Sequence, residues 1–168
     1  MNALECLKGG DLTVFTDILN QLDDNSIPLP DDHWINRSYE EEDGKFLLEL
    51  ALDKGLYDFI EVLIQAGASV NMCNPETRRF CIHAAVETGN VNILKLLFRH
   101  PKNSVQDVNV ALKNGQTALH IAVDKSFGDC FEFLLNHPNV NVNAKDKKGS
   151  KTPLYLAVKN GSTDMVTK

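Results

Sequence analysis

The feature that most constrains this chain is an internal repeat. The segment GQTALHIAV, which begins at Gly115, recurs as GSKTPLYLAV from Gly149. Weaker copies begin at Phe46 (FLLELAL) and at Phe80 (FCIHAAV). The four copies align on the apolar residues Leu48, Ile82, Leu119 and Leu154. Successive copies are 34, 37 and 35 residues apart. A period of about 20 to 50 residues is typical of proteins whose units stack into an elongated array.

Each copy is followed by a second apolar stretch, so one unit contains two short helices. In the third copy, Leu119, Ala122 and Val123 recur at the i, i+3 and i+4 spacing of one helix face. A second stretch with this spacing begins at Asp129. The turns between the two stretches hold Gly55, Gly89, Ser126 and Gly161. Since one helix pair cannot bury both apolar stripes, neighbouring pairs are predicted to stack.

The T-x-L-H motif at Thr117, the two short helices and a closing Val-Asn dipeptide resemble the ankyrin repeat. The dipeptide occurs at Val70-Asn71, Val108-Asn109 and Val142-Asn143. The resemblance covers residues 44–168. It implies an all-α ankyrin-repeat solenoid of stacked helix–turn–helix units with short β-hairpin loops. It also implies that Thr117 caps its helix and hydrogen-bonds to His120.

The repeats divide the chain into three regions. Residues 1–20 are predicted to form a degenerate N-terminal capping repeat, since terminal repeats are atypical. Residues 21–43 are predicted to form a long acidic loop, with Pro28, Pro30, Trp34 and an acidic run at 40–43. Ankyrin repeats are expected over residues 44–168, in units at about 44–76, 77–113, 114–147 and 148–168. The last unit is incomplete, because its second stretch has only Met165 and Val166 as large apolar residues.

Three departures from the family pattern carry expectations. Residues 80 and 81 (FC) replace the usual Thr-Pro pair and residues 74–77 (NPET) replace the usual hairpin tip, so the second hairpin should be irregular. Ser126 occupies a turn where glycine is usual, because glycine adopts positive φ without steric cost. Proline after His100 and after His137 should end the preceding helix firmly, because proline cannot continue a helix.

Composition and charge exclude several classes of protein. The formal net charge of -6 gives no continuous cationic track, so nucleic acid is not an expected partner. The N-terminus lacks the long apolar core of a secretory signal, and no apolar run approaches the length that spans a bilayer. The four cysteines have no CxxC spacing, so reduced thiols are expected. We therefore predict a cytosolic protein, or one on the cytosolic side of a membrane without direct membrane contact in this segment.

No arrangement of residues predicts catalysis, a cofactor or a metal site. His83 and His120 occupy the histidine position of the T-x-L-H motif, where a structural role is expected. His100 and His137 lie at helix C-termini, which leaves a pH-sensing role as an alternative. Cys81 and His83 are close in sequence, but no further ligand pair completes a zinc site. The chain is predicted not to be an enzyme.

Binding is predicted at the hairpin tips and first helices, which line the concave side of an ankyrin solenoid. The candidate partner-binding residues are Asn74, Glu76, Arg78, Arg79, Lys113, Asn114, Gln116, Lys147 and Lys148. Further candidates near the ends of the first helices are Asp53, Lys54, Glu87, Asp124 and Lys125. Their charges are mixed, which favours a protein partner with interleaved charges, although solubility alone would give similar tips.

The incomplete last unit favours an N-terminal fragment of a larger protein over a shortened native cap. The stretch FLLNHPNVNVN from Phe133 and the divergent, acidic start resemble the N-terminal ankyrin arrays of invertebrate A-type transient receptor potential cation channels. This resemblance implies a cytosolic array that precedes a membrane pore and regulates a tetrameric channel. The alternative is a stand-alone soluble ankyrin adaptor or inhibitor of a signalling or transcription factor. An enzyme with an ankyrin front end is a third possibility.

Overall fold

The computed structural model describes residues 3–20, 34–99 and 104–168. The α-helices of these residues are α1 (Ala3–Gly9), α2 (Leu12–Asn20), α3 (Leu47–Asp53), α4 (Tyr57–Gln65), α5 (Cys81–Glu87), α6 (Val91–Arg99), α7 (Ala118–Asp124), α8 (Gly128–Leu135), α9 (Pro153–Lys159) and α10 (Thr163–Val166). Two short strands, β1 (Ser38–Tyr39) and β2 (Lys45–Phe46), pair antiparallel. Two 3₁₀ turns, η1 (Trp34–Asn36) and η2 (Glu40–Glu42), lie beside β1.

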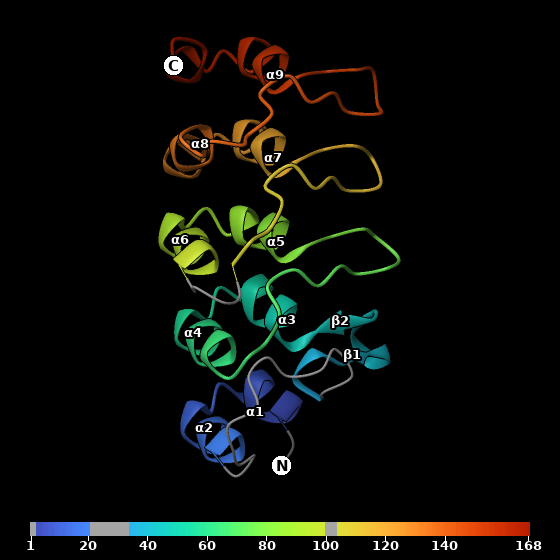
Figure 1. The fold of residues 1–168 in the computed structure, drawn as a ribbon, viewed down its shortest axis with the longest axis vertical. Coiled ribbons are helices and arrows are strands. Elements are labelled where there is room, and N and C mark those ends of the chain that lie inside the picture. The colour runs from blue at the N-terminus through green and yellow to red at the C-terminus, as the bar shows by residue number, and fades with distance from the viewer. Residues whose placement is uncertain (1–2, 21–33, 100–103) are drawn as a thin grey trace.

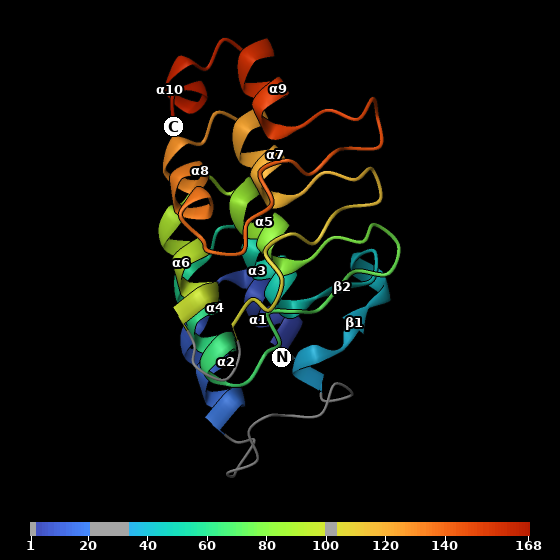
Figure 2. The same cartoon turned by 45° about the horizontal axis from the view of Figure 1, so that its top comes forward.

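The helices form two columns that run the length of an elongated stack (Figure 1). The odd-numbered helices make the inner column, in which α3 packs on α5, α5 on α7 and α7 on α9. The even-numbered helices make the outer column, in which α4 packs on α6 and α6 on α8. Hairpin loops project from the side of the inner column, one above another. They lie on the same side of the stack in both views (Figure 1 and Figure 2). The predicted solenoid of stacked helix–turn–helix units is confirmed.

The inner helices α3, α5 and α7 are seven residues long and are buried nearly all round. Every residue of α7 from Ala118 to Val123 is buried, because α8 covers one side and the inner helices before and after it cover two more. An isolated helix of this length is unstable in water. The inner column therefore depends on contacts between repeats.

Ser126 adopts the backbone conformation that glycine has at the same turn in the other repeats. Its φ is 59°, while Gly55, Gly89 and Gly161 have φ values of 65°, 72° and 69°. An L-residue in this left-handed region is strained by contact of its Cβ with the backbone. The third repeat thus keeps the turn geometry of the family at some cost in stability.

The second half of the predicted acidic loop has defined structure. Residues 34–43 contain η1, β1 and η2, and β1 pairs with β2 to form the first hairpin of the stack. The Lys8 Nζ atom lies 2.5 Å from the Glu42 carboxylate, which ties this hairpin to α1. Because the boundary predicted at residue 44 falls inside the hairpin, we propose that the first full repeat begins at about residue 34. Pro28 and Pro30 lie outside the described residues.

Two helix ends were predicted from proline residues, and the one at Pro138 lies in the described residues. Helix α8 ends at Leu135, three residues before Pro138. The His100-Pro101 stop lies outside the described residues. Helix α10 is only four residues long.

Candidate functional site

The hairpin tips of successive repeats are joined to one another by hydrogen bonds. The backbone N–H of Lys113 donates to the Thr77 carbonyl at 3.3 Å, and the N–H of Lys147 donates to the Asn114 carbonyl at 2.8 Å. At the first interface, Asn74 Nδ2 donates to the Asp43 carbonyl at 3.3 Å. The tips therefore form a continuous edge instead of independent loops.

Most of the predicted partner-binding residues lie exposed on this edge. The exposed members are Glu76, Arg78, Lys113, Lys147 and Lys148. Asn114 and Gln116 are half-buried and bond to each other: Asn114 Nδ2 donates to Gln116 Oε1 at 2.7 Å, and the Gln116 N–H donates to Asn114 Oδ1 at 2.9 Å. This pair shapes the third tip from within.

Asn74 is buried, with 2% of its surface exposed. Its Oδ1 accepts hydrogen bonds from the backbone N–H groups of Glu76 and Thr77, at 3.0 and 3.2 Å. These bonds shape the second hairpin, in which Arg78 has a φ of 55°. A non-glycine residue with positive φ also occurs in the first hairpin, at Asp43, and in the fourth, at Ser150, so this feature does not set the second hairpin apart.

Arg79 is the centre of an ion-pair cluster on the inner helices. Its guanidinium contacts the carboxylates of Glu49 at 2.9 Å, Asp53 at 2.6 Å and Glu87 at 2.5 Å. Burial disfavours its charge, but hydrogen bonds to Glu87, Asp53 and Glu49 outweigh that cost and raise the pKa of Arg79 above its ordinary value. Arg79, which the sequence predicted to bind a partner, therefore pairs with carboxylates of its own domain.

Glu49 stands at the third position of α3, the position that histidine occupies in α5 and α7. It is buried, and its Oε2 atom has no hydrogen-bond partner among the described residues. Its Oε1 atom pairs with the guanidinium of Arg79, which belongs to the next repeat. The first repeat interface thus uses an ion pair where the later interfaces use an imidazole.

His83 and His120 have the structural role predicted for them. In each ring Nδ1 accepts a backbone N–H, from Phe80 at 3.1 Å and from Thr117 at 3.2 Å. The Nε2 atom therefore carries the proton. It donates a hydrogen bond to a carbonyl group of the next hairpin, at 3.0 Å in both cases. Burial lowers the pKa of His83 to about 4. The Thr117 hydroxyl also lies 2.9 Å from His120 Nδ1, so the predicted bond between them is confirmed.

A second set of links between repeats comes from the closing dipeptides, whose role the sequence did not reveal. Asn71 donates to the Ser104 carbonyl at 3.0 Å and accepts from the Gln106 N–H at 3.0 Å. Asn109 donates to the Asn139 carbonyl and accepts from the Asn141 N–H, both at 2.7 Å. The recurring Val-Asn dipeptide was the sequence feature from which these links between repeats could have been predicted.

Asn36 belongs to the same series, one repeat earlier. Its Oδ1 accepts from the Ser69 N–H at 2.8 Å. The preceding Ile35 is buried, as are Val70 and Val108, the apolar residues of the later dipeptides. Ile35-Asn36 is therefore a fourth closing dipeptide, with isoleucine in place of valine.

The inner-helix surface carries two aligned columns of side chains. The last residues of the inner helices are Asp53, Glu87, Asp124 and Lys159, and the residues that precede their N-caps are Lys45, Arg79, Gln116 and Lys151. Lys45 pairs with Asp53 at 2.8 Å, and a hydrogen bond to Asp53 raises the pKa of Lys45. Asp124 is exposed, and in the described part of the chain it has no ion pair. The reason is that Gln116 stands where the earlier repeats have Lys45 and Arg79.

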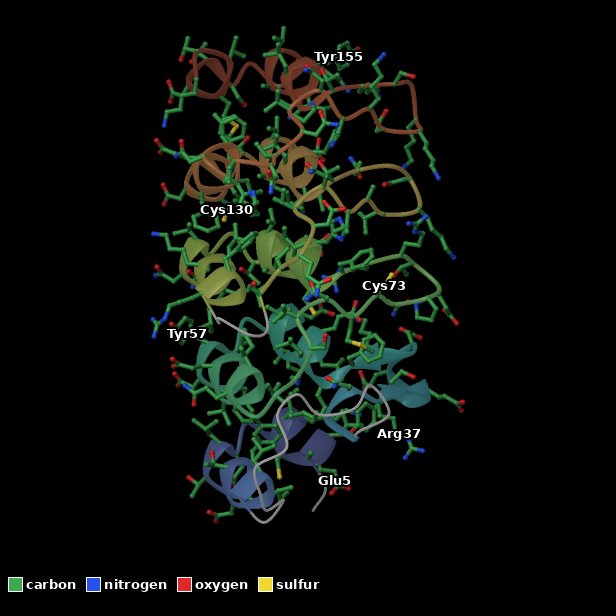
Figure 3. The ribbon with its side chains drawn as sticks, in the orientation of Figure 1. Glu5, Arg37, Tyr57, Cys73, Cys130 and Tyr155 are labelled. Atoms are coloured by element: carbon green, nitrogen blue, oxygen red, sulfur yellow. The ribbon has the colours of Figure 1, made fainter. Side chains whose placement is uncertain are left out.

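The described residues offer little else for chemistry. Within them, no group of three or more His, Cys, Asp or Glu side chains could hold a metal ion. None of the described helices has the length and apolar character needed to cross a membrane. Cys6, Cys81 and Cys130 are buried free thiols, and burial raises the pKa of Cys81 to about 12. Cys73, on the second hairpin, is half-buried (Figure 3).

The stacked helix pairs and their linked hairpins define an ankyrin-repeat domain, which is a protein-interaction module. The family model for ankyrin repeats (3 copies) matches residues 47–146 and 82–168, and the chain belongs to this family. It is 32% identical to the nuclear factor NF-kappa-B p105 subunit of Gallus gallus over 111 residues, which is 66% of this chain and 11% of that protein.

Two further relatives cover more of the chain. The B-cell lymphoma 3 protein homolog of Mus musculus is 33% identical over 119 residues, 71% of this chain and 26% of that protein. Rabankyrin-5 of Homo sapiens is 31% identical over 160 residues, 76% of this chain and 13% of that protein. The chain spans about a quarter or less of the length of these relatives.

Proposed function

We propose that this domain binds a protein partner along the edge formed by its hairpin tips and the adjoining ends of the inner helices. The observation that carries the proposal is the hydrogen bonding between successive tips. Because the Lys113 and Lys147 N–H groups each bond to the preceding tip, the backbone that carries the exposed side chains is fixed before a partner binds. A surface that is ordered in advance loses less conformational entropy on binding.

The charges on this surface suggest the chemistry of the partner. The exposed side chains of the third and fourth tips include Lys113, Lys147 and Lys148, which favour acidic groups on the partner. The column of inner-helix carboxylates leaves Asp124 without an ion pair in the described chain, which favours a basic group beside it. We therefore propose a partner with interleaved acidic and basic side chains. Arg79 and Asn74 are left out of this surface, since both are engaged within the fold.

The test is a charge-reversal variant in which Arg78, Lys113 and Lys147 are all replaced by Glu. These side chains are exposed and lack ion pairs in the described chain, so the fold should keep its helical spectrum. The affinity of the domain for its protein partner should fall at least roughly tenfold, because the new Glu side chains would face acidic groups of the partner across the interface. The matched control reverses Lys95 on the outer helix α6. Undiminished capture by the tip variant, with an unchanged spectrum, would remove the assignment of this edge.

The first candidate for the whole protein is an adaptor or inhibitor of a signalling or transcription factor. It is favoured by similarity to the nuclear factor NF-kappa-B p105 subunit and to the B-cell lymphoma 3 protein homolog. Purified nuclear factor NF-kappa-B is therefore the first partner to titrate against the domain by calorimetry. The tip variant should bind it more weakly than the unaltered domain. Absence of heat exchange with the unaltered domain would reject this partner.

The second candidate is the cytosolic regulatory array of a transient receptor potential-type cation channel. Its support is the resemblance of the FLLNHPNVNVN stretch and of the divergent start. The relatives reported above are not named as channels, so this candidate stays a prediction. Under it the domain is an N-terminal fragment of a tetrameric membrane protein. Sequencing beyond Lys168 tests it, because a channel requires apolar spans of about 20 residues in the downstream reading frame.

A further inference from the structure

The outer helices α4 and α6 border a polar hollow on the side of the stack away from the hairpin loops (Figure 1). The hollow has a volume of about 510 Å³, and its lining residues are Tyr57, Asn90, Asn92, Lys95, Leu96 and Arg99. Figure 3 shows Tyr57 on the outer column, away from Cys73 of the second hairpin. Binding sites for small molecules have volumes of about 300–1,000 Å³. The hollow is therefore large enough for a small molecule, and it is separate from the edge of hairpin tips.

Two cations of α6 line this hollow without a counter-ion. Lys95 and Arg99 stand four residues apart, which places them on one face of the helix. Both side chains are exposed, and neither forms an ion pair in the described chain. Like charges at this spacing destabilise a helix. An anion held between them would relieve a repulsion that is present in the domain alone.

The positive charge is confined to this one outer helix, although the chain as a whole has a formal net charge of -6. Helix α4 carries Asp58 and Glu61, and α8 carries Asp129 and Glu132, whereas α6 carries no acidic residue. None of these four carboxylates is among the described residues that line the hollow. Since the net charge of the chain repels anions, an anion that binds here must do so through direct contacts with α6.

Neutral hydrogen-bond donors surround the two cations. Asn90 is held in place just before α6, because its backbone N–H donates to Thr88 Oγ1 at 3.1 Å and its Oδ1 accepts from the Asn92 N–H at 2.9 Å. The Nδ2 atoms of Asn90 and Asn92 and the hydroxyl of Tyr57 have no hydrogen-bond partner in the part of the chain that the structure describes. Together with the two cations, these donors exceed what the two oxygens of a carboxylate need. They suit the three terminal oxygens of a phosphate monoester.

We propose that the hollow binds a small molecule that carries a phosphate monoester. Lys95 and Arg99 bind the phosphate through charge-assisted hydrogen bonds, and the hydroxyl of Tyr57 donates to a remaining oxygen. A phosphate monoester has about two negative charges at neutral pH, which matches the two cations. The organic part of the ligand packs against the Tyr57 ring and Leu96, the apolar surfaces of the hollow. The inference does not depend on partner binding at the hairpin tips.

The test titrates the domain with phenyl phosphate and follows the backbone amide signals by NMR. We expect the signals of Asn92, Lys95 and Arg99 to shift with a common saturation curve, while those of Lys113 and Lys147 on the hairpin tips stay in place. Phenol has the same ring without the phosphate and should shift none of them. Phenyl phosphate should also raise the Tm of the domain, because a ligand that binds only the folded state stabilises it.

A double variant tests the two cations. Lys95→Gln with Arg99→Gln should weaken phenyl phosphate binding at least roughly tenfold, because two charge-assisted hydrogen bonds are lost. Both side chains are exposed and unpaired in the described chain, so the variant should keep its helical spectrum. The matched control, Lys147→Gln with Lys148→Gln, removes the same charge at a hairpin tip and should change the affinity less than about twofold, because salt screens distant charges. Tyr57→Phe should weaken binding by a smaller factor than the loss of both cations.

Three outcomes would overturn the proposal. One is the absence of amide shifts in the unaltered domain at millimolar phenyl phosphate. Another is equal weakening by the two double variants, which would mean that only the net charge matters. The third is binding of phosphatidylcholine vesicles that contain phosphatidic acid without any binding of phenyl phosphate, which would replace the small molecule by a lipid headgroup. Lys95→Glu should lose phenyl phosphate binding and keep protein binding at the tips, so the failure of either surface can be told from the failure of the other.

Discussion

Replacing Arg79 by Met should destabilise the domain more than any single change on its surface. The substitution keeps much of the aliphatic volume but removes the cation that faces three carboxylates. The Glu49 side chain is 4% exposed and has no other cation in contact among the described residues. Leaving such a charge buried and unpaired costs about 3–5 kcal/mol. Glu87, at 34% exposed, lies closer to the surface range of about 0–1 kcal/mol. The expected loss is therefore about 3–5 kcal/mol and comes mainly from Glu49.

A second substitution separates the charge from the packing. Gln at position 49 keeps the shape of Glu49 and removes its charge. The double variant Glu49→Gln with Arg79→Met should therefore be more stable than Arg79→Met alone by at least about 1 kcal/mol, since the uncompensated buried charge is gone. The neighbouring Arg78 is exposed and makes no ion pair in the described chain. Arg78→Met is the matched control and should stay within about 0.5 kcal/mol of the unaltered domain.

The measurement is urea unfolding followed by circular dichroism at pH 7, with all four proteins fitted to a common slope. Two results would refute the reasoning. A loss below about 1 kcal/mol for Arg79→Met would place the cluster on the scale of exposed ion pairs. A double variant no more stable than Arg79→Met would mean that the loss comes from packing, with no penalty from the stranded Glu49 carboxylate.

Three further predictions concern the histidine and the turns. His83 binds its proton at about pH 6.5 when unfolded and only near pH 4 when folded. The unfolded state therefore binds more protons between these values, and unfolding free energy should fall by up to about 3 kcal/mol as the pH drops through this window. His83→Gln should flatten that part of the profile in urea titrations. Gly115→Ala should cost more than Gly161→Ala in thermal unfolding, because its Cβ would lie 2.7 Å from the Lys147 backbone nitrogen, whereas Gly161 faces open space. Equal costs would show that only φ strain matters. Ser126→Gly should raise stability by up to about 1 kcal/mol by relieving its positive φ, and a lower Tm would contradict this.

The sequence predicted the parts of the fold that repeat and missed the parts that differ between repeats. The helix pairs followed from the spacing of residues such as Leu119 and Val123, because burial of apolar side chains is periodic. The roles of His120 and Thr117 followed from a local motif, in which both partners lie within one turn. These features depend on short stretches of sequence, and short stretches are what a pattern can read.

Contacts between repeats could not be read in the same way. The partners of Arg79 lie in two different helices, and the packing of α5 on α3 brings Glu49 within its reach. The first hairpin was missed because Ile35-Asn36 departs from the Val-Asn spelling and stands beside an irregular acidic segment. Lys113, Lys147 and Lys148 are exposed, and their role in binding a partner stays a prediction. Asn74 and Arg79 are engaged within the fold by neighbours that lie in the preceding repeat, which a local pattern does not show.

The direction of the links between repeats bears on how such an array can be rebuilt. At the later interfaces the asparagine and histidine side chains come from the upstream repeat and bind backbone groups of the downstream one. For these hydrogen bonds a downstream unit needs only the correct backbone path, while the apolar packing between units still requires side chains that fit, such as Phe98 against Phe133. The first interface is different, because Asn74 and Arg79 reach back to the preceding repeat. Moving either of the first two full repeats alone should consequently break the Arg79–Glu49 pair, whereas a later unit should keep its asparagine and histidine links.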